Sequence, residues 1–195
     1  MRSTPQMGAW VFVCGPSGSG KDSVMAYAQQ GLASRPDIVF ARRFVTRPVH
    51  AGSDHDALTP AAFVALLQAG GLHWHWQAHG FCYGIASRYG DAVRAGALVV
   101  VNGSRAHVHS LPASPDVRVV HVTADAEALA RRLRQRGRDS AEAVAQRLER
   151  NADFNGTKAD CVIVNNGALA DAGRQLADYL AGASSAELAC RSTAA

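Results

Sequence analysis

The chain has 195 residues, of which 48% are hydrophobic and 18% charged, and its formal net charge is +4. This composition is that of a globular protein long enough to bury a substantial core. No apolar run approaches the roughly 18 residues of a membrane-spanning helix, and no secretion signal is visible. We therefore exclude a membrane protein and expect a cytoplasmic one, and the positive charge is compatible with an anionic partner.

Short apolar runs that end in glycine or polar residues predict the strands of a sheet. In chain order, the expected strands cover residues 9–15, 38–46, 72–85 (two strands with a tight turn at Gly80), 97–104, 117–124 and 161–166. Segments with helical periodicity lie between them. They cover residues 21–33, 59–71, 87–96, 125–137, 139–154 and 168–183, with Thr59 and Asp125 as expected N-caps.

Apolar strands that alternate with helices predict an α/β fold, in which helices cover both faces of a central parallel sheet. Residues 47–57 are polar and are expected to form a loop. We see no repeat and no long linker, so a single domain is expected over residues 1–195, with a flexible tail at 184–195.

Residues 15–23 read GPSGSGKDS and connect the first expected strand to the first expected helix. A glycine-rich turn at this place directs successive backbone N–H groups to one point, and the helix N-terminus adds positive potential. Lys21 is one of only two lysines in the chain, which argues against a chance match. The segment therefore predicts a phosphate-binding loop. Its expected binding residues are Gly15, Pro16, Ser17, Gly18, Ser19, Gly20, Lys21, Asp22 and Ser23.

Asp22 occupies the position at which such loops usually carry Ser or Thr. A carboxylate is a good ligand for Mg²⁺, so Asp22 is a candidate metal ligand, directly or through water. In the alternative, the carboxylate only stabilises the helix N-terminus, and Ser23 supplies the hydroxyl. Both interpretations stay open, with the metal role favoured.

Three groups of side chains outside the loop are candidates for phosphate recognition. Arg43 and Arg47 lie on one side of the expected strand and predict an anion clamp, unless both are simply solvated. Arg132 and Arg136 share a helix face, and Arg147 comes from the next helix. Like charges at this spacing repel, so this cluster predicts a phosphate site as well, with a solvated face as the alternative. Asn102, Ser104 and Arg105 follow a buried strand, where open α/β sheets bind ligands.

The segments GPSGSGK, TR-P, YG, RL-x-x-RG with a following RL, and VIVNN resemble guanylate kinases over about residues 9–183. GPSGSGKDS, AGSDH-x-AL, W-x-A-x-G-x-x-YG and VNGSRAH look more like the ribose 1,5-bisphosphate phosphokinase family, whose loop also carries Asp after the lysine. The departures from guanylate kinases agree with this choice. The stretch WHWQAH has no carboxylate where those enzymes carry a base-reading Glu, Asn102 replaces their strand-end Asp, and Arg43 replaces a Ser.

This resemblance implies a P-loop kinase that uses ATP and Mg²⁺ to convert ribose 1,5-bisphosphate to 5-phosphoribosyl 1-diphosphate in phosphonate breakdown. It also implies an acceptor-binding region over about residues 35–97 and an arginine-rich lid over about residues 125–155. The residues expected to act in catalysis are Lys21, Asp22, Arg132, Arg136 and Arg147. Those expected to bind the acceptor are Arg43, Thr46, Arg47, Tyr83, Asn102, Ser104 and Arg105.

Two other functions stay open, a guanylate kinase that acts on GMP and a non-catalytic guanylate-kinase-like binding module. The retained loop and arginines weigh against the module. No basic stripe interleaves with aromatic residues, so no nucleic-acid partner is expected. The expected partner is a small phosphorylated sugar, and the oligomeric state is left open.

Overall fold

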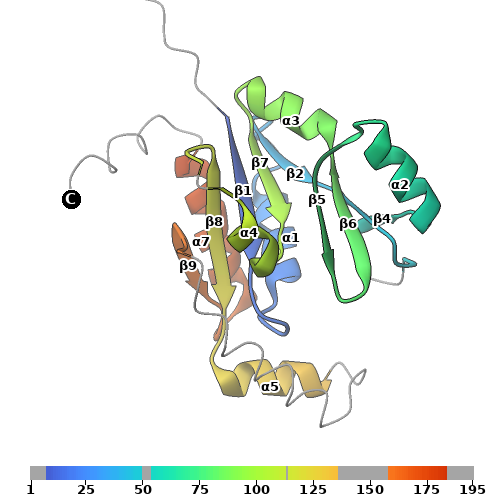
Figure 1. Ribbon diagram of the computed structural model, residues 1–195. Helices are drawn as coiled ribbons and strands as arrows, with labels where there is room; N and C mark the ends of the chain where they lie inside the picture. The colour runs from blue at the N-terminus through green and yellow to red at the C-terminus, as the bar shows by residue number, and fades with distance from the viewer. Residues whose placement is uncertain (1–7, 50–53, 113, 136–157, 184–195) are drawn as a thin grey trace, which may run out of the picture.

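The computed structural model describes residues 8–49, 54–112, 114–135 and 158–183, which form two sheets with helices around them (Figure 1). The larger sheet has five parallel strands in the order β2–β7–β1–β8–β9. Its strands are β1 (Ala9–Cys14), β2 (Ile38–Ala41), β7 (Leu98–Asn102), β8 (Val117–Thr123) and β9 (Cys161–Val164). The predicted central parallel sheet is confirmed.

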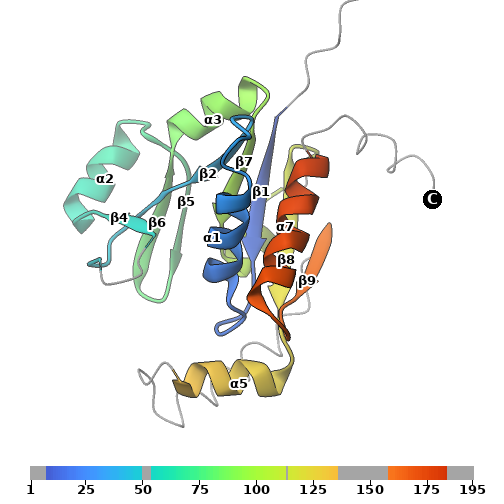
Figure 2. The same cartoon turned by 180° about the vertical axis from the view of Figure 1, so that it is seen from behind.

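Helices α1 (Lys21–Gly31) and α7 (Leu169–Ala183) pack side by side on one face of this sheet (Figure 2). Val11 and Val13 point into the core beneath these helices. Trp10 and Phe12 point into a second core on the opposite face, because successive side chains of a strand alternate between faces. Both faces of β1 are therefore buried, which explains its continuous apolar sequence.

A second sheet covers the other core and has the strand order β4–β3–β6–β5. Its strands are β3 (Arg43–Val45), β4 (His55–Ala57), β5 (Leu72–Ala78) and β6 (Phe81–Ala86). The helices on this side of the molecule are α2 (Pro60–Gln68), α3 (Ser87–Arg94) and the short α4 (Arg105–Ser110). The second sheet lies within the region that the sequence assigned to the acceptor.

The single strand expected at 38–46 is wrong, because the structure divides it between the two sheets. The main-chain N–H of Arg42 donates to the Tyr89 hydroxyl (3.0 Å) instead of continuing a ladder, and its guanidinium pairs with Asp56 (2.6 Å). The chain leaves the parallel sheet here and enters β3. The expected loop at 47–57 also needs correction, since His55–Ala57 forms β4 in parallel with β3. Helix α4 was not expected.

Several local predictions are confirmed. Thr59 caps α2, its hydroxyl oxygen accepting from the Ala62 N–H (3.2 Å), and Asp125 accepts from the Ala128 N–H (2.7 Å) at the start of α5 (Ala126–Gln135). His79 and Gly80 form the turn between β5 and β6, both with positive φ. None of the helices in the described ranges is long and apolar enough to cross a membrane. The helix expected at 139–154 and the tail at 184–195 lie outside these ranges.

Candidate active site

The predicted phosphate-binding loop, residues 15–20, joins β1 to α1 at the carboxyl edge of the parallel sheet (Figure 1). This is where the connections from the central strand diverge, the usual ligand position of an open α/β sheet. Gly18 and Gly20 have φ values of 90° and 79°, which glycine adopts without strain. A Cβ on Gly20 would also lie 2.5 Å from Asn165 Nδ2. The loop conformation therefore requires glycine at position 20.

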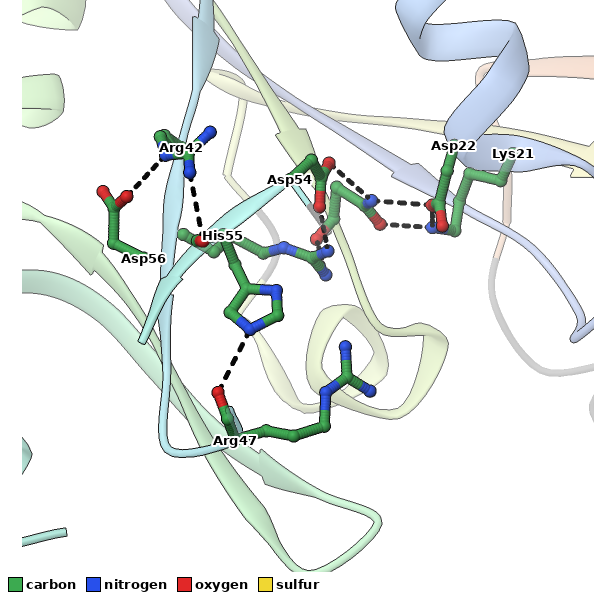
Figure 3. A network of polar contacts seen from close by, with 9 residues as sticks. Lys21, Asp22, Arg42, Arg47, Asp54, His55 and Asp56 are labelled. Carbon is green, nitrogen blue, oxygen red and sulfur yellow. Dashed lines mark hydrogen bonds and ion pairs between the residues drawn. The ribbon is translucent and has the colours of Figure 1, made fainter. Parts of the chain in front are cut away.

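Three hydrogen bonds join the side chains of Lys21, Asp22 and Asn102. Figure 3 shows Lys21 and Asp22 next to each other at the start of α1. The Lys21 ammonium donates to Asp22 Oδ1 (2.7 Å) and to Asn102 Oδ1. Asn102 Nδ2 donates to the same Asp22 oxygen (2.8 Å). Asn102 is 1% exposed at the end of β7. Its buried amide therefore holds the Lys21 and Asp22 side chains in position.

Partial desolvation by neighbouring groups opposes ionisation of Asp22, but the Lys21 ammonium, the Asn102 hydrogen bond and Arg43 outweigh it and lower the pKa of this carboxyl from 3.8 to about 2. Asp22 is therefore a carboxylate at any physiological pH. Ser23, the alternative source of a hydroxyl, is exposed on α1. The described contacts thus involve the Asp22 carboxylate and leave Ser23 at the surface.

The network continues from Asn102 to two residues of the second sheet and its loop. Arg43 donates to the main-chain carbonyl of Asn102 (3.1 Å) and to Asp54 Oδ1 (3.0 Å). Asn102 Nδ2 also donates to the other oxygen of Asp54 (3.4 Å). One buried residue therefore connects the lysine after the loop with the predicted acceptor arginine of β3.

Arg47 is the second arginine of the predicted clamp, and its side chain extends into the space below Asp54 and Asp22 (Figure 3). Its guanidinium lies 5.9 Å from the Phe81 ring centroid, and its buried Nε has no hydrogen-bond partner among the described residues. His55 is 1% exposed and donates from Nε2 to the Arg47 carbonyl (3.2 Å). The backbone of Arg47 is thus anchored, and its guanidinium lies over the Phe81 ring.

Tyr83 and Thr46 support this region from within the second sheet. Tyr83 is buried, stacks on Trp76 with ring centroids 5.4 Å apart, and lies beneath the Arg43 guanidinium (5.9 Å). The Thr46 hydroxyl oxygen accepts from the Cys82 N–H (2.9 Å), which ties the end of β3 to β6. Tyr83 therefore contacts the predicted clamp directly, whereas Thr46 has a structural hydrogen bond.

Arg132 of α5 contacts the backbone of the phosphate-binding loop. It donates to the main-chain carbonyls of Asn165 (2.8 Å) and Ser19 (3.4 Å). Asn165 Nδ2 donates to the same Ser19 carbonyl (2.8 Å), and Asn165 is 4% exposed. Arg132 is therefore close to the loop, and its role in catalysis stays a prediction. The other two predicted lid residues, Arg136 and Arg147, lie outside the described residues.

Ser104 is the N-cap of α4 and Arg105 is its first residue, shortly after the end of β7. Burial lowers the pKa of Arg105, an effect that Cys14 opposes. Burial also raises the pKa of the Cys14 thiol to about 12, although Lys21 and Arg105 act in the other direction. Cys14 is thus a protonated core side chain, and Arg105 lies next to the end of β1.

Sequence reasoning missed two residues of this site, Asp54 and Asn165. Asp54 belongs to a polar stretch with no pattern that separates it from a solvated loop, although AGSDH contributed to the family resemblance. Asn165 follows β9, and polar residues at strand ends were the signal used for Asn102. The same criterion applied to residues 165–166 would have found it.

No family model matches the chain. A curated relative in Pseudofrankia inefficax, described as a ribose 1,5-bisphosphate phosphokinase, is 44% identical over 183 residues, covering 93% of this chain and 95% of that protein. The chain belongs to the ribose 1,5-bisphosphate phosphokinase family. Another member, from Laribacter hongkongensis, is 42% identical over 181 residues, which cover 90% of this chain but 43% of that longer relative. The chain thus spans less than half of the Laribacter protein.

A guanylate kinase from Anaplasma phagocytophilum has a similar structure, with a TM-score of 0.66, 18% identity, and coverage of 92% of this chain and 87% of that one. This likeness confirms the P-loop kinase fold. The predicted family and fold of this ribose 1,5-bisphosphate phosphokinase family member are therefore confirmed, whereas the roles of its individual site residues stay predictions.

Proposed function

We propose that the chain transfers the γ-phosphoryl group of ATP to the 1-phosphate of ribose 1,5-bisphosphate in phosphonate breakdown. An oxygen of the 1-phosphate attacks the γ-phosphorus, the bond to the β–γ bridging oxygen breaks, and ADP and 5-phosphoribosyl 1-diphosphate leave. The observation that carries the proposal is the position of Asn102. Its buried amide contacts Lys21 and Asp22 beside the phosphate loop, and its carbonyl accepts from Arg43.

On the nucleotide side, the glycine-rich loop and the start of α1 provide backbone N–H groups for phosphate oxygens. Lys21 supplies a cation beside them, and its contacts to Asp22 and Asn102 orient it toward the acceptor region. Arg132 supplies a second cation from α5. These positive charges offset the repulsion between ATP and a doubly phosphorylated acceptor, and they stabilise negative charge in a loose transition state.

Asp22 is the residue that fits Mg²⁺, because it is an ionised oxygen ligand of the type that this cation prefers. Its side chain is 64% exposed, so it is accessible beside the loop. Bound Mg²⁺ would neutralise charge on the β- and γ-phosphates. The protein's own residues then hold the nucleotide and acceptor in line.

The acceptor is expected to bind against Arg43 and Arg47. The buried Nε of each arginine has no hydrogen-bond partner among the described residues, and the terminal nitrogens of Arg43 also contact Asp54 and Asn102. Two guanidinium groups suit two phosphates, since Arg binds phosphate oxygens through paired N–H groups. Tyr83 positions Arg43 from beneath.

This site does not need a general base to remove a proton from the acceptor. A phosphate monoester has a second pKa near ~6 and is largely a dianion at neutral pH. Catalysis therefore consists of positioning and charge stabilisation. The absence of a suitably placed neutral base from the described network is compatible with the reaction.

The site gives less support to GMP as the acceptor. β5 contains no carboxylate that could read a guanine edge, and its Trp74 and Trp76 pack against the second core instead. Trp76 is 8% exposed and stacks between Tyr83 and His107. A non-catalytic binding module is disfavoured because the phosphate loop retains the glycines and the lysine.

Phosphorus-31 NMR of ATP, Mg²⁺ and ribose 1,5-bisphosphate with the protein tests this proposal. Diphosphate resonances on ribose C1 should appear with the wild-type chain and with Lys158→Ala, the other lysine, which is exposed. Lys21→Ala should reduce their rate of appearance by about 100-fold or more. Consumption of GMP without a sugar diphosphate would indicate a guanylate kinase, and no turnover of either acceptor would indicate a binding module. The predicted cytoplasmic location stays a prediction.

A further inference from the structure

Asp54 is a carboxylate placed between the predicted phosphate-binding cations. One of its oxygens accepts from Arg43 (3.0 Å) and the other from Asn102 Nδ2 (3.4 Å). These two hydrogen bonds fix the orientation of the carboxylate. Its side chain is nevertheless 54% exposed. Each carboxylate oxygen has two lone pairs, and the hydrogen bonds from Arg43 and Asn102 leave part of this acceptor capacity for a ligand.

The neighbours of Asp54 restrict what that ligand group can be. Lys21 and Asp22 lie on one side, and the Arg47 side chain extends into the space on the other (Figure 3). A carboxylate accepts hydrogen bonds and repels phosphate. In an acceptor with two anionic phosphates, the only groups that can donate to it are neutral hydroxyls.

We propose that Asp54 recognises the vicinal C2 and C3 hydroxyls of the acceptor's ribose and thereby selects ribose over deoxyribose. The two oxygens of a carboxylate can accept from two neighbouring hydroxyls at once, the pairing by which acidic residues bind ribose hydroxyls in dinucleotide-binding folds. Arg43 and Arg47 then bind the phosphates on either side. This inference rests on the proposed function, because it presumes a phosphorylated sugar as the acceptor.

Asp54 is suited to this role in a way that neighbouring Asp56 is not. Asp56 pairs with Arg42 (2.6 Å), and Figure 3 shows this pair apart from the Lys21–Asp22 side of the network. Asp56 therefore supplies a matched control of the same residue type, two positions away. Its substitution tests the effect of losing a carboxylate and an arginine contact outside the acceptor site.

The loss of a hydroxyl that donates to a carboxylate removes a charge-assisted hydrogen bond. We expect the wild-type chain to prefer ribose 1,5-bisphosphate over 2-deoxyribose 1,5-bisphosphate by about 10- to 100-fold in kcat/KM. Asp54→Ala should lower kcat/KM for the ribose substrate to near the level of the deoxy substrate. Asp54→Asn, which retains one acceptor oxygen, should give an intermediate preference, and Asp56→Ala should keep the wild-type preference.

The experiment measures kcat/KM of these four proteins with both sugars, together with a Mg²⁺ titration. Collapse of the preference in Asp54→Ala, with a larger loss of kcat/KM for the ribose substrate than for the deoxy substrate, which keeps the C3 hydroxyl, supports the proposal if the Mg²⁺ midpoint is unchanged. Equal losses with both sugars would overturn it, because they would mean that Asp54 only holds Arg43. A preserved preference with a shifted Mg²⁺ midpoint would also overturn it. If the wild-type chain used neither sugar but consumed GMP, the proposed function itself would fail.

Discussion

The side-chain amide of Asn102 donates a hydrogen bond of 2.8 Å to the carboxylate of Asp22. The two residues are far apart in the sequence, at the end of β7 and the start of α1. Through this bond and the contact of Asn102 Oδ1 with Lys21, a neutral amide satisfies an anion and a cation at once. A carboxylate at position 102 could accept from Lys21 but could not donate to Asp22.

Asn102→Asp should therefore disrupt the site more than its small change in shape suggests. The substitution removes the donor to Asp22 and places a buried charge next to Asp22 and Asp54. We expect kcat/KM for ribose 1,5-bisphosphate to fall by about 10- to 100-fold, since each lost hydrogen bond to a charged group is worth about 1.5–3 kcal/mol. Steady-state kinetics at fixed Mg²⁺ measures this, and unchanged kcat/KM would contradict the role assigned to the amide.

The Gly20→Ala substitution should destabilise the phosphate loop. Position 20 has a φ of 79°, which costs a non-glycine residue about 1–3 kcal/mol, and the added Cβ would meet Asn165. At Gly31, the last residue of α1, an added methyl group would meet no atom within 4 Å, so Gly31→Ala is the control. Urea unfolding should show a loss for Gly20→Ala and no loss for Gly31→Ala. Equal stability of the two variants would refute the geometric argument.

Most of the parallel sheet and the phosphate loop could be predicted from the sequence, because their signals are local. β1, β7 and β8 are apolar runs, and the loop combines glycines with Lys21 between a strand and a helix. The division at Arg42 could not be predicted, since it depends on a hydrogen bond to Tyr89, a residue of α3. Asp54 was missed for the same reason, because its partners Arg43 and Asn102 become neighbours only in the folded chain.

Removal of the Arg132 side chain should slow turnover without unfolding the protein. Arg132 reaches the carbonyls of Ser19 and Asn165 from α5, next to the phosphate loop. We expect Arg132→Ala to lower kcat by about 100- to 1,000-fold, as for loss of one preorganised charge. Arg131→Ala, a change at an exposed position of the same helix, should keep near-wild-type kcat. Similar kcat values for the two variants would exclude a catalytic role for Arg132.

The pH dependence of the reaction should show no contribution from Asp22. Its pKa of about 2 lies below the ordinary value of 3.8, so its ionic contacts stabilise the folded chain above that value and are lost as the pH falls toward 2. The fall of kcat/KM at low pH should instead follow protonation of the acceptor phosphate, which has a pKa of ~6. Asp22→Asn should raise the Mg²⁺ midpoint and leave this fall at the same pH. A shift of this fall to another pH would mean that Asp22 titrates in the working range.

The most direct test of the account compares the two candidate acceptors on one preparation of the protein. Initial rates of ADP release are measured at saturating ATP and Mg²⁺ over a range of ribose 1,5-bisphosphate or GMP. Two arginines at the proposed acceptor position, without a carboxylate on β5, predict that kcat/KM for ribose 1,5-bisphosphate exceeds that for GMP by about 100-fold or more. A kcat/KM for GMP equal to or above that for ribose 1,5-bisphosphate would contradict the account.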